Sequence, residues 1–527
     1  MSNIFPLPPT PQPGARRPEA IEVDLANDRR RLRTALDAAD WSAVHSLVDD
    51  NFFAYLFDIP DLLQEVFDAA PAHWYQDYPR VAMTRAIADA VRRPATLIAD
   101  EPRAAFEAWV ASQEAPATRD MLGLRQAHLR VLITSGRYRD ASLAADEDVR
   151  LLRRADDSLG FHDVLPSVLI RCGTAKLLDG EIEASLALFS EAVHWSTVRG
   201  EHPIAPYARA HLALSYALLE RYQQAARLLQ EHLPVFAPGA IQYQYQWAGV
   251  LAGVIVAAGE LRHRDAEDQL SELDRSLVAG DCWWIVLHAK AMVALNQAAP
   301  WPMIEELDEQ LARNAARASP ATGAGCILRA DLAMLYQAAG DLRAAEHLLS
   351  TKGIPPAAHL VVLGRARQEL LRGRPERTLA LLHADEQQAL NVSPVRRTPQ
   401  GAVIYAAAEL AITGQLAHAT AQAAVAAVNG RHAYSALVQA PSALRDLLAP
   451  FVEIPLAEVP VTFDFRPVVK LTRREKDMLN ALRVHGTVAE AAAALHISPN
   501  TAKTHISALY RKLGARSRDE AIWLGLR

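Results

Sequence analysis

Residues 498–514 read SPNTAKTHISALYRKLG, and this stretch is the clearest helix signal in the chain. Ser498 can cap a helix with its hydroxyl group, and Pro499 suits the first helical position because no amide donor is needed there. Gly514 readily takes the left-handed conformation that ends a helix. Between these ends, four apolar residues recur at helical spacing: Ala502, Ile506, Leu509 and Leu513. The sequence therefore predicts a helix over residues 499–513 with one buried face.

The face beside this apolar stripe carries cations among small polar groups. Its members are Asn500, Lys503, Thr504, Ser507 and Arg511. Small side chains let a helix approach the floor of the DNA major groove, and cations at its edges reach the phosphates. An ordinary solvated face would have a similar composition, so the neighbouring segments must decide between the two interpretations.

Three further helix starts surround this stretch, and each has the spacing of a capping box, in which a hydroxyl residue is followed three positions later by glutamate. The pairs are Thr472 with Glu475, Thr487 with Glu490, and Ser517 with Glu520. Gly486 ends the first of these helices, and residues 496–498 form a tight turn before the helix over 499–513. Four short helices with this turn before the third predict a helix-turn-helix domain.

The same residues resemble the LuxR-type helix-turn-helix domain. Its pattern is Leu-Thr-x-Arg-Glu, then Ile-Ser-x-x-Thr-Val-Lys-x-His, then Lys-Leu-Gly. This chain reads LTRRE at 471–475, ISPNTAKTH at 497–505 and RKLG at 511–514, with Ala502 where the family has valine. The second helix begins TVAEAAA at 487–493, where the family usually has Asn-Lys-Glu-Ile-Ala. The resemblance covers the chain from about residue 471 to its end.

The resemblance implies roles for individual residues. The side chains implied to face base edges are Lys503, Thr504 and Ser507, and those implied to lie near phosphates are Ser498, Asn500, Thr501 and Arg511. We expect His505, which the family shares, to be packed within the domain. The fourth helix is often a dimer contact in this family, which makes Trp523 and Leu524 candidate dimer contacts.

Charge is unevenly distributed along the chain. From residue 471 onward the sequence has ten Lys/Arg and five Asp/Glu, a net charge of +5. Because the whole chain of 527 residues carries −6, the rest carries −11. A basic terminal domain on an acidic body is typical of a nucleic-acid reader attached to a domain with another role.

Upstream of this domain the chain repeats a turn signal about every forty residues, which lies in the range of helix-pair repeats. Clear copies are GRYRDA at 136–141, GEIEA at 180–184, RYQQA at 221–225, GELRHRDA at 259–266 and GDLRA at 340–344. Gly373 and Gly414 continue the pattern, and residues 296–303 are a degenerate copy. We expect each glycine to form the turn and the alanines to let antiparallel helices approach closely. The pattern resembles long tetratricopeptide-type repeats and predicts an α-solenoid.

The expected fold class is all-α, with five segments. They are a disordered proline-rich leader at 1–19, an irregular helical region at 20–118, the tetratricopeptide-like α-solenoid at 119–449, a proline-spaced linker at 450–467 and the four-helix LuxR-type domain at 468–527. No apolar run is long enough to cross a bilayer, and the leader has no apolar core typical of a signal peptide, so a cytoplasmic location is expected.

Several function classes find no support in the sequence. The phosphate-binding pattern Gly-x-x-x-x-Gly-Lys-Ser/Thr, common in large LuxR-type regulators, is absent, and neither His-Glu-x-x-His nor Gly-x-Ser-x-Gly occurs. The three cysteines lie far apart, without the spacing of a zinc site or a disulfide framework. We therefore expect no enzymatic activity, no catalytic residues, no cofactor and no bound metal.

The predicted solenoid would offer a concave groove for a peptide, a protein or a small effector. Four aromatic residues are candidates for lining it, although aromatic residues in repeats are more often core: Tyr245, Trp247, Trp283 and Trp284. The sequence favours a transcription regulator that binds a promoter operator in double-stranded DNA as a homodimer and senses an effector or a protein partner through its body. The alternative is a helical-repeat adaptor whose C-terminal domain mediates protein contacts.

Overall fold

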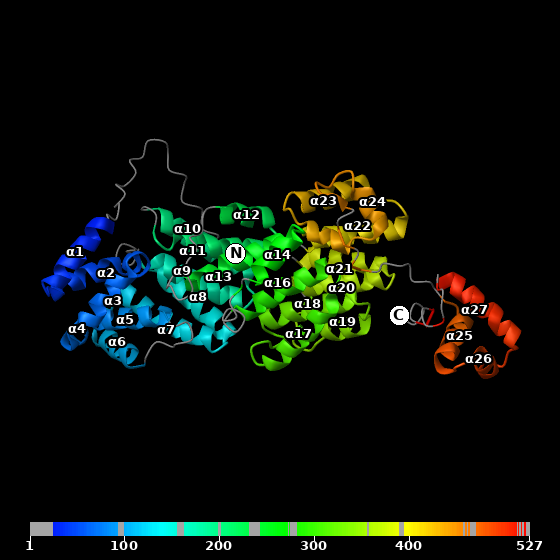
Figure 1. The fold of residues 1–527 in the computed structure, drawn as a ribbon, viewed down its shortest axis with the longest axis horizontal. Helices are drawn as coiled ribbons and strands as arrows, with labels where there is room; N and C mark the ends of the chain where they lie inside the picture. Colours follow the sequence, from blue (N-terminus) through cyan, green and yellow to red (C-terminus); the bar gives the residue numbers. More distant parts are fainter. Residues whose placement is uncertain are drawn as a thin grey trace. The chain divides into compact units, whose positions relative to one another are not determined.

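The computed structural model confirms the all-α fold class (Figure 1). Within the residues that it describes, every regular element is a helix and no strand occurs. The described residues are 25–92, 100–154, 163–198, 202–230, 243–271, 273, 282–355, 358–388, 395–456, 459–460, 462–463, 471–513, 515, 518 and 521–522. The predicted leader at 1–19 lies outside them.

The chain divides into two compact units, which are described separately. The first comprises residues 1–293, 311–328 and 431–433, and the second comprises 294–310, 329–430 and 434–527. Three helices contribute residues to both units: α16 (Trp283–Asn296), α17 (Pro300–Arg313) and α18 (Gly323–Ala338). Among the described helices of either unit, none combines the length and apolarity required to span a membrane.

The remaining helices each belong to one unit. Those of the first unit are α1 (Leu25–Asp37), α2 (Trp41–Asp58), α3 (Pro60–Ala69), α4 (Ala72–Asp77), α5 (Pro79–Arg92), α6 (Asp100–Ser112), α7 (Thr118–Thr134), α8 (Tyr138–Arg154), α9 (Leu165–Leu178), α10 (Ile182–Thr197), α11 (Ala205–Leu218), α12 (Tyr222–Gln230), α13 (Tyr243–Gly259) and α14 (His263–Ser271). Those of the second unit are α19 (Leu342–Leu349), α20 (His359–Leu371), α21 (Pro375–Gln388), η2 (Val395–Arg397), α22 (Pro399–Thr413), α23 (His418–Asn429), η3 (Tyr434–Gln439), α24 (Ser442–Leu448), α25 (Arg473–Val484), α26 (Val488–Ala494) and α27 (Pro499–Leu513).

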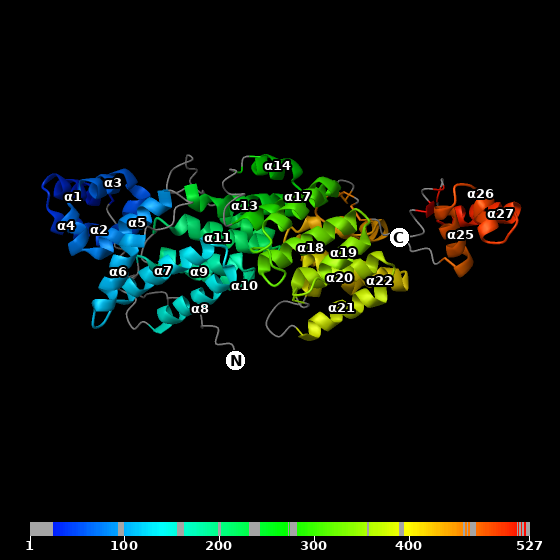
Figure 2. The ribbon, with the colours of Figure 1, turned by 90° about the horizontal axis from the view of Figure 1, so that it is seen from below.

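Helices that follow one another in sequence pack against one another. In the first unit α9 contacts α8 and α10, and α11 contacts α10 and α12 (Figures 1 and 2). Alanine makes this packing close, because residues such as Ala208 and Ala213 of α11 are fully buried and hold the helix axes near one another. Contact between sequence neighbours is what a helical-repeat body requires, and the α-solenoid remains a prediction for the arrangement as a whole.

The turns within successive helix pairs contain a left-handed residue. The backbone angle φ is positive at the glycines 136, 180, 340, 373 and 414, as the repeat pattern predicted, and also at Glu220, Leu261 and Ala298. At Gly180, the amide of Glu181 donates to the carbonyl of Lys176 and the amide of Gly180 to that of Leu177, both at 2.9 Å. These two bonds form the Schellman motif, which satisfies the last carbonyl groups of a helix.

The prediction that Gly259 forms its turn is wrong. The left-handed residue there is Leu261, with φ of 61°, while Gly259 is the last residue of α13. A Cβ atom on Gly259 would lie 2.2 Å from the ring of Tyr222, which is buried. This glycine is therefore required for the close approach of α12 to α13 and not for the turn.

Part of the predicted linker at 450–467 is folded into the second unit. Val459 and Phe463 are buried, and the hydroxyl group of Thr462 donates to the carbonyl of Leu295 at 2.8 Å. The buried guanidinium of Arg445 donates to the carbonyls of Val459 and Pro460 at 2.8 and 2.7 Å. These contacts assign residues 459–463, as far as they are described, to the helical body, although their proline spacing suggested a linker.

Candidate nucleic-acid interface

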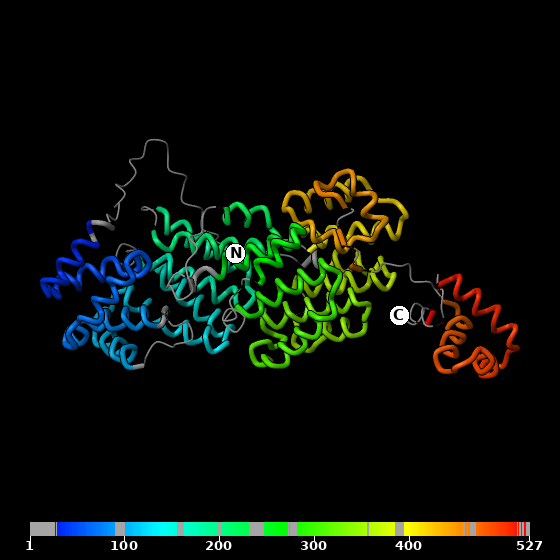
Figure 3. The backbone as a smooth tube through the Cα atoms, viewed as in Figure 1, coloured from blue at the N-terminus to red at the C-terminus, as the bar shows by residue number. Residues whose placement is uncertain are grey.

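Helices α25, α26 and α27 pack around one small hydrophobic core, and Figure 3 follows the backbone from α25 into α27. The predicted stripe of α27 faces this core, since Ala502, Ile506, Leu509 and Leu513 are all buried. It meets buried residues of the other two helices, namely Met478, Leu479, Leu482, Ala491 and Ala492. The buried stripe fixes the rotation of α27 about its own axis, and therefore which side chains it exposes.

Side-chain caps fix where these helices begin. The hydroxyl group of Thr472 accepts from the amide of Glu475 at 3.3 Å, and the carboxylate of Glu475 accepts from the amide of Thr472 at 2.6 Å. Thr487 and Glu490 make the same two bonds at the start of α26, so two of the three predicted capping boxes are confirmed. The third pair, Ser517 and Glu520, lies outside the described residues. Ser498 caps α27 by accepting from the amide of Thr501 at 3.1 Å. Each such cap typically contributes about 1 kcal/mol to helix stability.

A three-residue turn connects α26 to α27. His496 lies in the left-handed region with φ of 54°, and the amide of Ile497 donates to the carbonyl of Ala492 at 3.0 Å. Ile497 is half-buried against the domain core. The turn therefore has the hydrogen bond of a Schellman motif and an apolar residue that anchors it, which together set the angle between α26 and α27.

The structure brings the predicted DNA-contacting residues together on the exposed surface of α27. Lys503, Thr504 and Ser507 are exposed on adjacent turns, while Ser498, Asn500 and Thr501 are exposed at the start of the helix and Arg511 near its end. The hydroxyl group of Thr504 donates to the carbonyl of Asn500 at 3.1 Å, so its oxygen atom faces outward as an acceptor. The roles of these residues toward DNA remain predictions.

His505 differs from expectation. We expected it to be packed within the domain, but its side chain is exposed on α27. The inward positions are taken by Ala502 and Ile506, which are three residues before it and one residue after it. The spacing of the apolar stripe already contains this information, because residue 505 falls between the stripe positions.

Two polar contacts hold the ends of the domain together. Lys512 of α27 forms an ion pair with Glu475 of α25, with Nζ to oxygen distances of 2.7 and 2.9 Å. This ion pair and the bond from the amide of Thr472 lower the pKa of Glu475 to about 2. Arg518, which is helical, donates to the carbonyls of Leu482, His485 and Gly486 and so fixes the segment after α27 to the end of α25.

The other candidate residues lie in different environments. Trp283 and Trp284 are core residues of the first unit, with exposed fractions of 2% and 0%. Trp247 is half-buried and packs edge-on against His211 at 5.2 Å between ring centroids. The side chain of Tyr245 lies outside the described residues, as do Trp523 and Leu524. The interpretation of Trp283 and Trp284 as core residues is therefore the one that agrees with the structure.

Three helices around one core, with a tight turn before a helix that exposes small polar and cationic side chains, define a helix-turn-helix domain of the kind that reads DNA. Residues 469–524 match the family described as "Bacterial regulatory proteins, luxR family", and this segment is a LuxR-type helix-turn-helix domain.

Several bacterial regulators are similar to this domain. The "Probable csgAB operon transcriptional regulatory protein" of Salmonella typhimurium and the "CsgBAC operon transcriptional regulatory protein" of Escherichia coli are each 44% identical to it over 52 residues. The "Probable transcriptional regulatory protein NarL" of Mycobacterium tuberculosis is 38% identical over 52 residues. The match spans 10% of this chain and 24% of each of these relatives, so the likeness concerns one short segment and not the whole protein.

Proposed function

We propose that this protein is a sequence-specific DNA-binding transcription regulator that inserts α27 into the major groove of double-stranded DNA. The observation that carries the proposal is the exposed face of α27, on which Lys503, Thr504 and Ser507 lie together while the opposite stripe is buried. A helix with this division of faces presents a fixed set of donors and acceptors to the groove. The similarity of the domain to named transcriptional regulators supports the same function.

The contacts divide into base readout and phosphate binding. Lys503, Thr504 and Ser507 lie on adjacent turns of the helix and would contact base edges: the ammonium group donates to guanine, the hydroxyl group of Thr504 accepts, and that of Ser507 accepts or donates. Ser498, Asn500 and Thr501 lie at the N-terminus of α27, whose dipole and amide groups favour an anion. They would contact phosphate groups together with Arg511, which is exposed near the other end of the helix.

The proposal extends to the whole chain. The protein would act in the cytoplasm as a homodimer on two operator half-sites, with Trp523 and Leu524 as candidate dimer contacts. The helical body, proposed to be an α-solenoid between residues 119 and 449, would sense an effector or bind a protein partner and thereby control the DNA-binding domain. The acidic charge of the body, −11 before residue 471, keeps DNA binding confined to the terminal domain.

Capture of genomic fragments by the full-length protein, followed by sequencing, tests this function. We expect a short sequence element to be enriched with wild-type protein and to be lost with Lys503→Ala. The variant Lys352→Ala is the matched control, because Lys352 is an exposed lysine outside the helix-turn-helix domain. If no element is enriched by folded wild-type protein, the DNA-binding function is wrong, and the adaptor alternative takes its place.

A further inference from the structure

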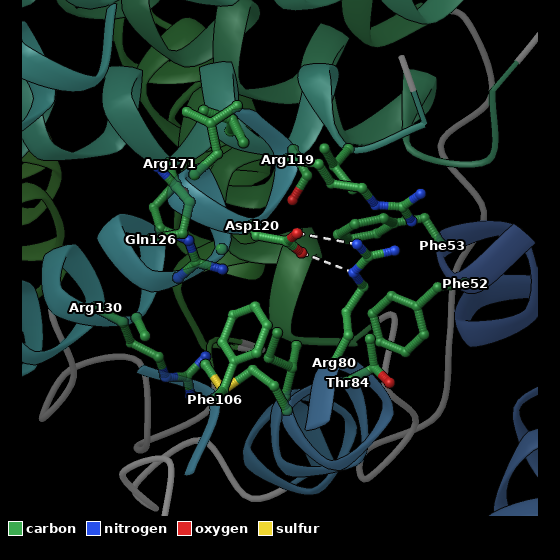
Figure 4. A pocket seen from close by; sticks show the side chains of 18 of the residues that line it. Phe52, Phe53, Arg80, Thr84, Phe106, Arg119, Asp120, Gln126, Arg130 and Arg171 are labelled. Atoms are coloured by element: carbon green, nitrogen blue, oxygen red, sulfur yellow. Dashed lines mark hydrogen bonds and ion pairs between the residues drawn. The ribbon is translucent and has the colours of Figure 1, made fainter. Parts of the chain in front are cut away.

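A cavity of about 100 Å³ lies among the helices of the first unit, far before the DNA-binding domain in the sequence (Figure 4). Its lining comes from α2, α5, α6, α7 and α9. The residues used below are Phe52, Arg80, Phe106, Arg119, Gln126 and Arg171. Nothing in the sequence predicted this site, because its walls are five helices spread over about 120 residues of chain.

The size and apolar walls of the cavity fit a single aromatic ring. The buried side chains of Phe52, Leu56, Met83 and Phe106 line it, all at least 98% buried. An apolar cavity of about 150 Å³ binds benzene, so the smaller volume here, about 100 Å³, limits the occupant to a single ring whose polar substituents lie against the polar part of the lining. Aromatic walls favour an aromatic occupant, because rings gain from offset or edge-to-face packing.

Four arginines line the cavity, and two of them are neutralised by carboxylates. Arg80 forms a two-bond pair with Asp120, at 2.7 and 3.0 Å, and an ion pair with Asp49 at 2.6 Å. Arg119 forms an ion pair with Asp163 at 2.8 Å. These pairs hold the side chains of Arg80 and Arg119 in place, so neither guanidinium is available to an anion from outside.

Arg171 differs from Arg80 and Arg119 in having no carboxylate partner. It is half-buried on α9, and in the described part of the chain it forms no ion pair and no side-chain hydrogen bond. Because no protein carboxylate occupies its N–H donors, the guanidinium of Arg171 can bind an anion from outside. Arginine binds a carboxylate through two parallel hydrogen bonds, which makes a carboxylate the fitting anion.

Gln126 supplies an unmet acceptor on the same side of the cavity as Arg171 (Figure 4). Its amide nitrogen donates to Asp148 at 3.1 Å, while its Oε1 atom is buried and accepts no hydrogen bond from the described residues. A buried carbonyl oxygen without a donor is destabilising, because it has lost its hydration and gained no hydrogen bond in return. A ligand with a hydroxyl group would satisfy this oxygen.

We propose that this cavity binds a small hydroxylated aromatic carboxylic acid. The ring lies between Phe52 and Phe106, the carboxylate pairs with Arg171, and the hydroxyl group donates to Oε1 of Gln126. The ion pairs of Arg80 and Arg119 hold the walls around the ring. All residues that line the cavity belong to the first unit, so the proposed binding of such an acid does not depend on the proposed DNA-binding function.

Isothermal titration calorimetry of the full-length protein tests the site with four probes: 2-hydroxybenzoate, 4-hydroxybenzoate, benzoate and benzamide. We expect at least one hydroxybenzoate to bind and benzamide, which is neutral, to bind roughly tenfold more weakly, as the loss of a charge-assisted hydrogen bond implies. Arg171→Met should weaken hydroxybenzoate binding by a similar factor and Arg171→Lys by less. Gln126→Leu should weaken the hydroxybenzoate without changing the affinity for benzoate.

The control variant is Arg150→Met, which removes the same charge from an exposed position on α8 that does not line the cavity. It should bind the hydroxybenzoate as wild type does. Circular dichroism of each variant shows that it is folded. The proposal is overturned if folded wild-type protein binds neither hydroxybenzoate, if Arg171→Met binds as tightly as wild type, or if benzamide binds equally well.

Discussion

Glu475 takes part in two interactions that stabilise the DNA-binding domain. It belongs to the capping box that starts α25, and it accepts both hydrogen bonds of the ion pair with Lys512 of α27. Both interactions favour the ionised carboxylate, the ion pair with Lys512 most of all, which is why the pKa of Glu475 falls from its ordinary value of 4.5 to about 2. A lowered folded-state pKa means that this contribution to stability is complete above about pH 4.5 and is lost as the pH falls toward 2.

The pKa of Glu475 should therefore respond to its partner. In Lys512→Met we expect the pKa of Glu475 to rise toward 4.5, because the bond to Lys512, the largest cause of its lowering, has been removed. NMR of protein labelled with ¹³C at the glutamate carboxyl groups measures this pKa, and the signal is identified by its loss in Glu475→Gln. Lys476→Met, which removes an exposed lysine of α25, is the control and should leave the pKa unchanged. An unchanged pKa in Lys512→Met would refute the ion pair.

At the same scale, the residues of α27 show what the sequence reveals about a site. The stripe, the capping boxes of α25 and α26, and the exposure of Lys503, Thr504 and Ser507 were all predictable from local spacing, since each depends on residues within a few helical turns. The environments of Trp283 and Trp284 were not predictable, because a tryptophan in a helical repeat suits either a groove or a core. Only the tertiary packing decides between them.

Among the elements, the turns between helices show where sequence patterns stop being sufficient. Glycine predicts the left-handed turn at Gly136, Gly180 and Gly340, but Leu261 and Ala298 take the same conformation without that signal. A left-handed conformation costs an ordinary residue about 1–2 kcal/mol. The Schellman hydrogen bonds and the packing of the two helices offset that cost, and neither is visible in a single stretch of sequence.

Close contact between α9 and α10 gives a prediction at this scale. A Cβ atom on Gly173 of α9 would lie 2.5 Å from the ring of Phe189, which is fully buried, so that side chain or the helix would have to shift. Gly173→Ala should therefore destabilise the protein by about 1–3 kcal/mol, the usual cost of overpacking. The midpoint of thermal unfolding, followed by circular dichroism, should fall accordingly.

Gly123→Ala is the matched control, because Gly123 also lies within a helix of the first unit. Its added Cβ would meet the ring of Phe106 at 3.4 Å, an ordinary contact. The higher helix propensity of alanine, about 1 kcal/mol, should leave the midpoint unchanged or raise it. If the midpoint of thermal unfolding fell equally in both variants, the loss of glycine, and not the contact with Phe189, would be responsible for the destabilisation.

For the whole molecule, the central feature is the separation of charge and of binding sites along the chain. The basic domain at the C-terminus has a net charge of +5 from residue 471, and the body before it carries −11. The cavity, in contrast, is assembled from α2, α5, α6, α7 and α9 of the first unit. The sequence predicts the DNA-contacting face of α27 because that face is formed by neighbouring residues. It does not predict the cavity, because helices far apart in the sequence pack together to form the cavity.

The most direct test of the account is the affinity of the full-length protein for a captured operator fragment, measured by fluorescence anisotropy at several salt concentrations. Wild-type affinity should fall steeply with salt, because phosphate contacts release counterions. Lys503→Ala should bind roughly tenfold more weakly, as the loss of a base contact worth about 1–3 kcal/mol implies, while Lys352→Ala should bind as wild type does. Equal affinity of Lys503→Ala and wild type would contradict the assignment of α27 as the helix that reads DNA.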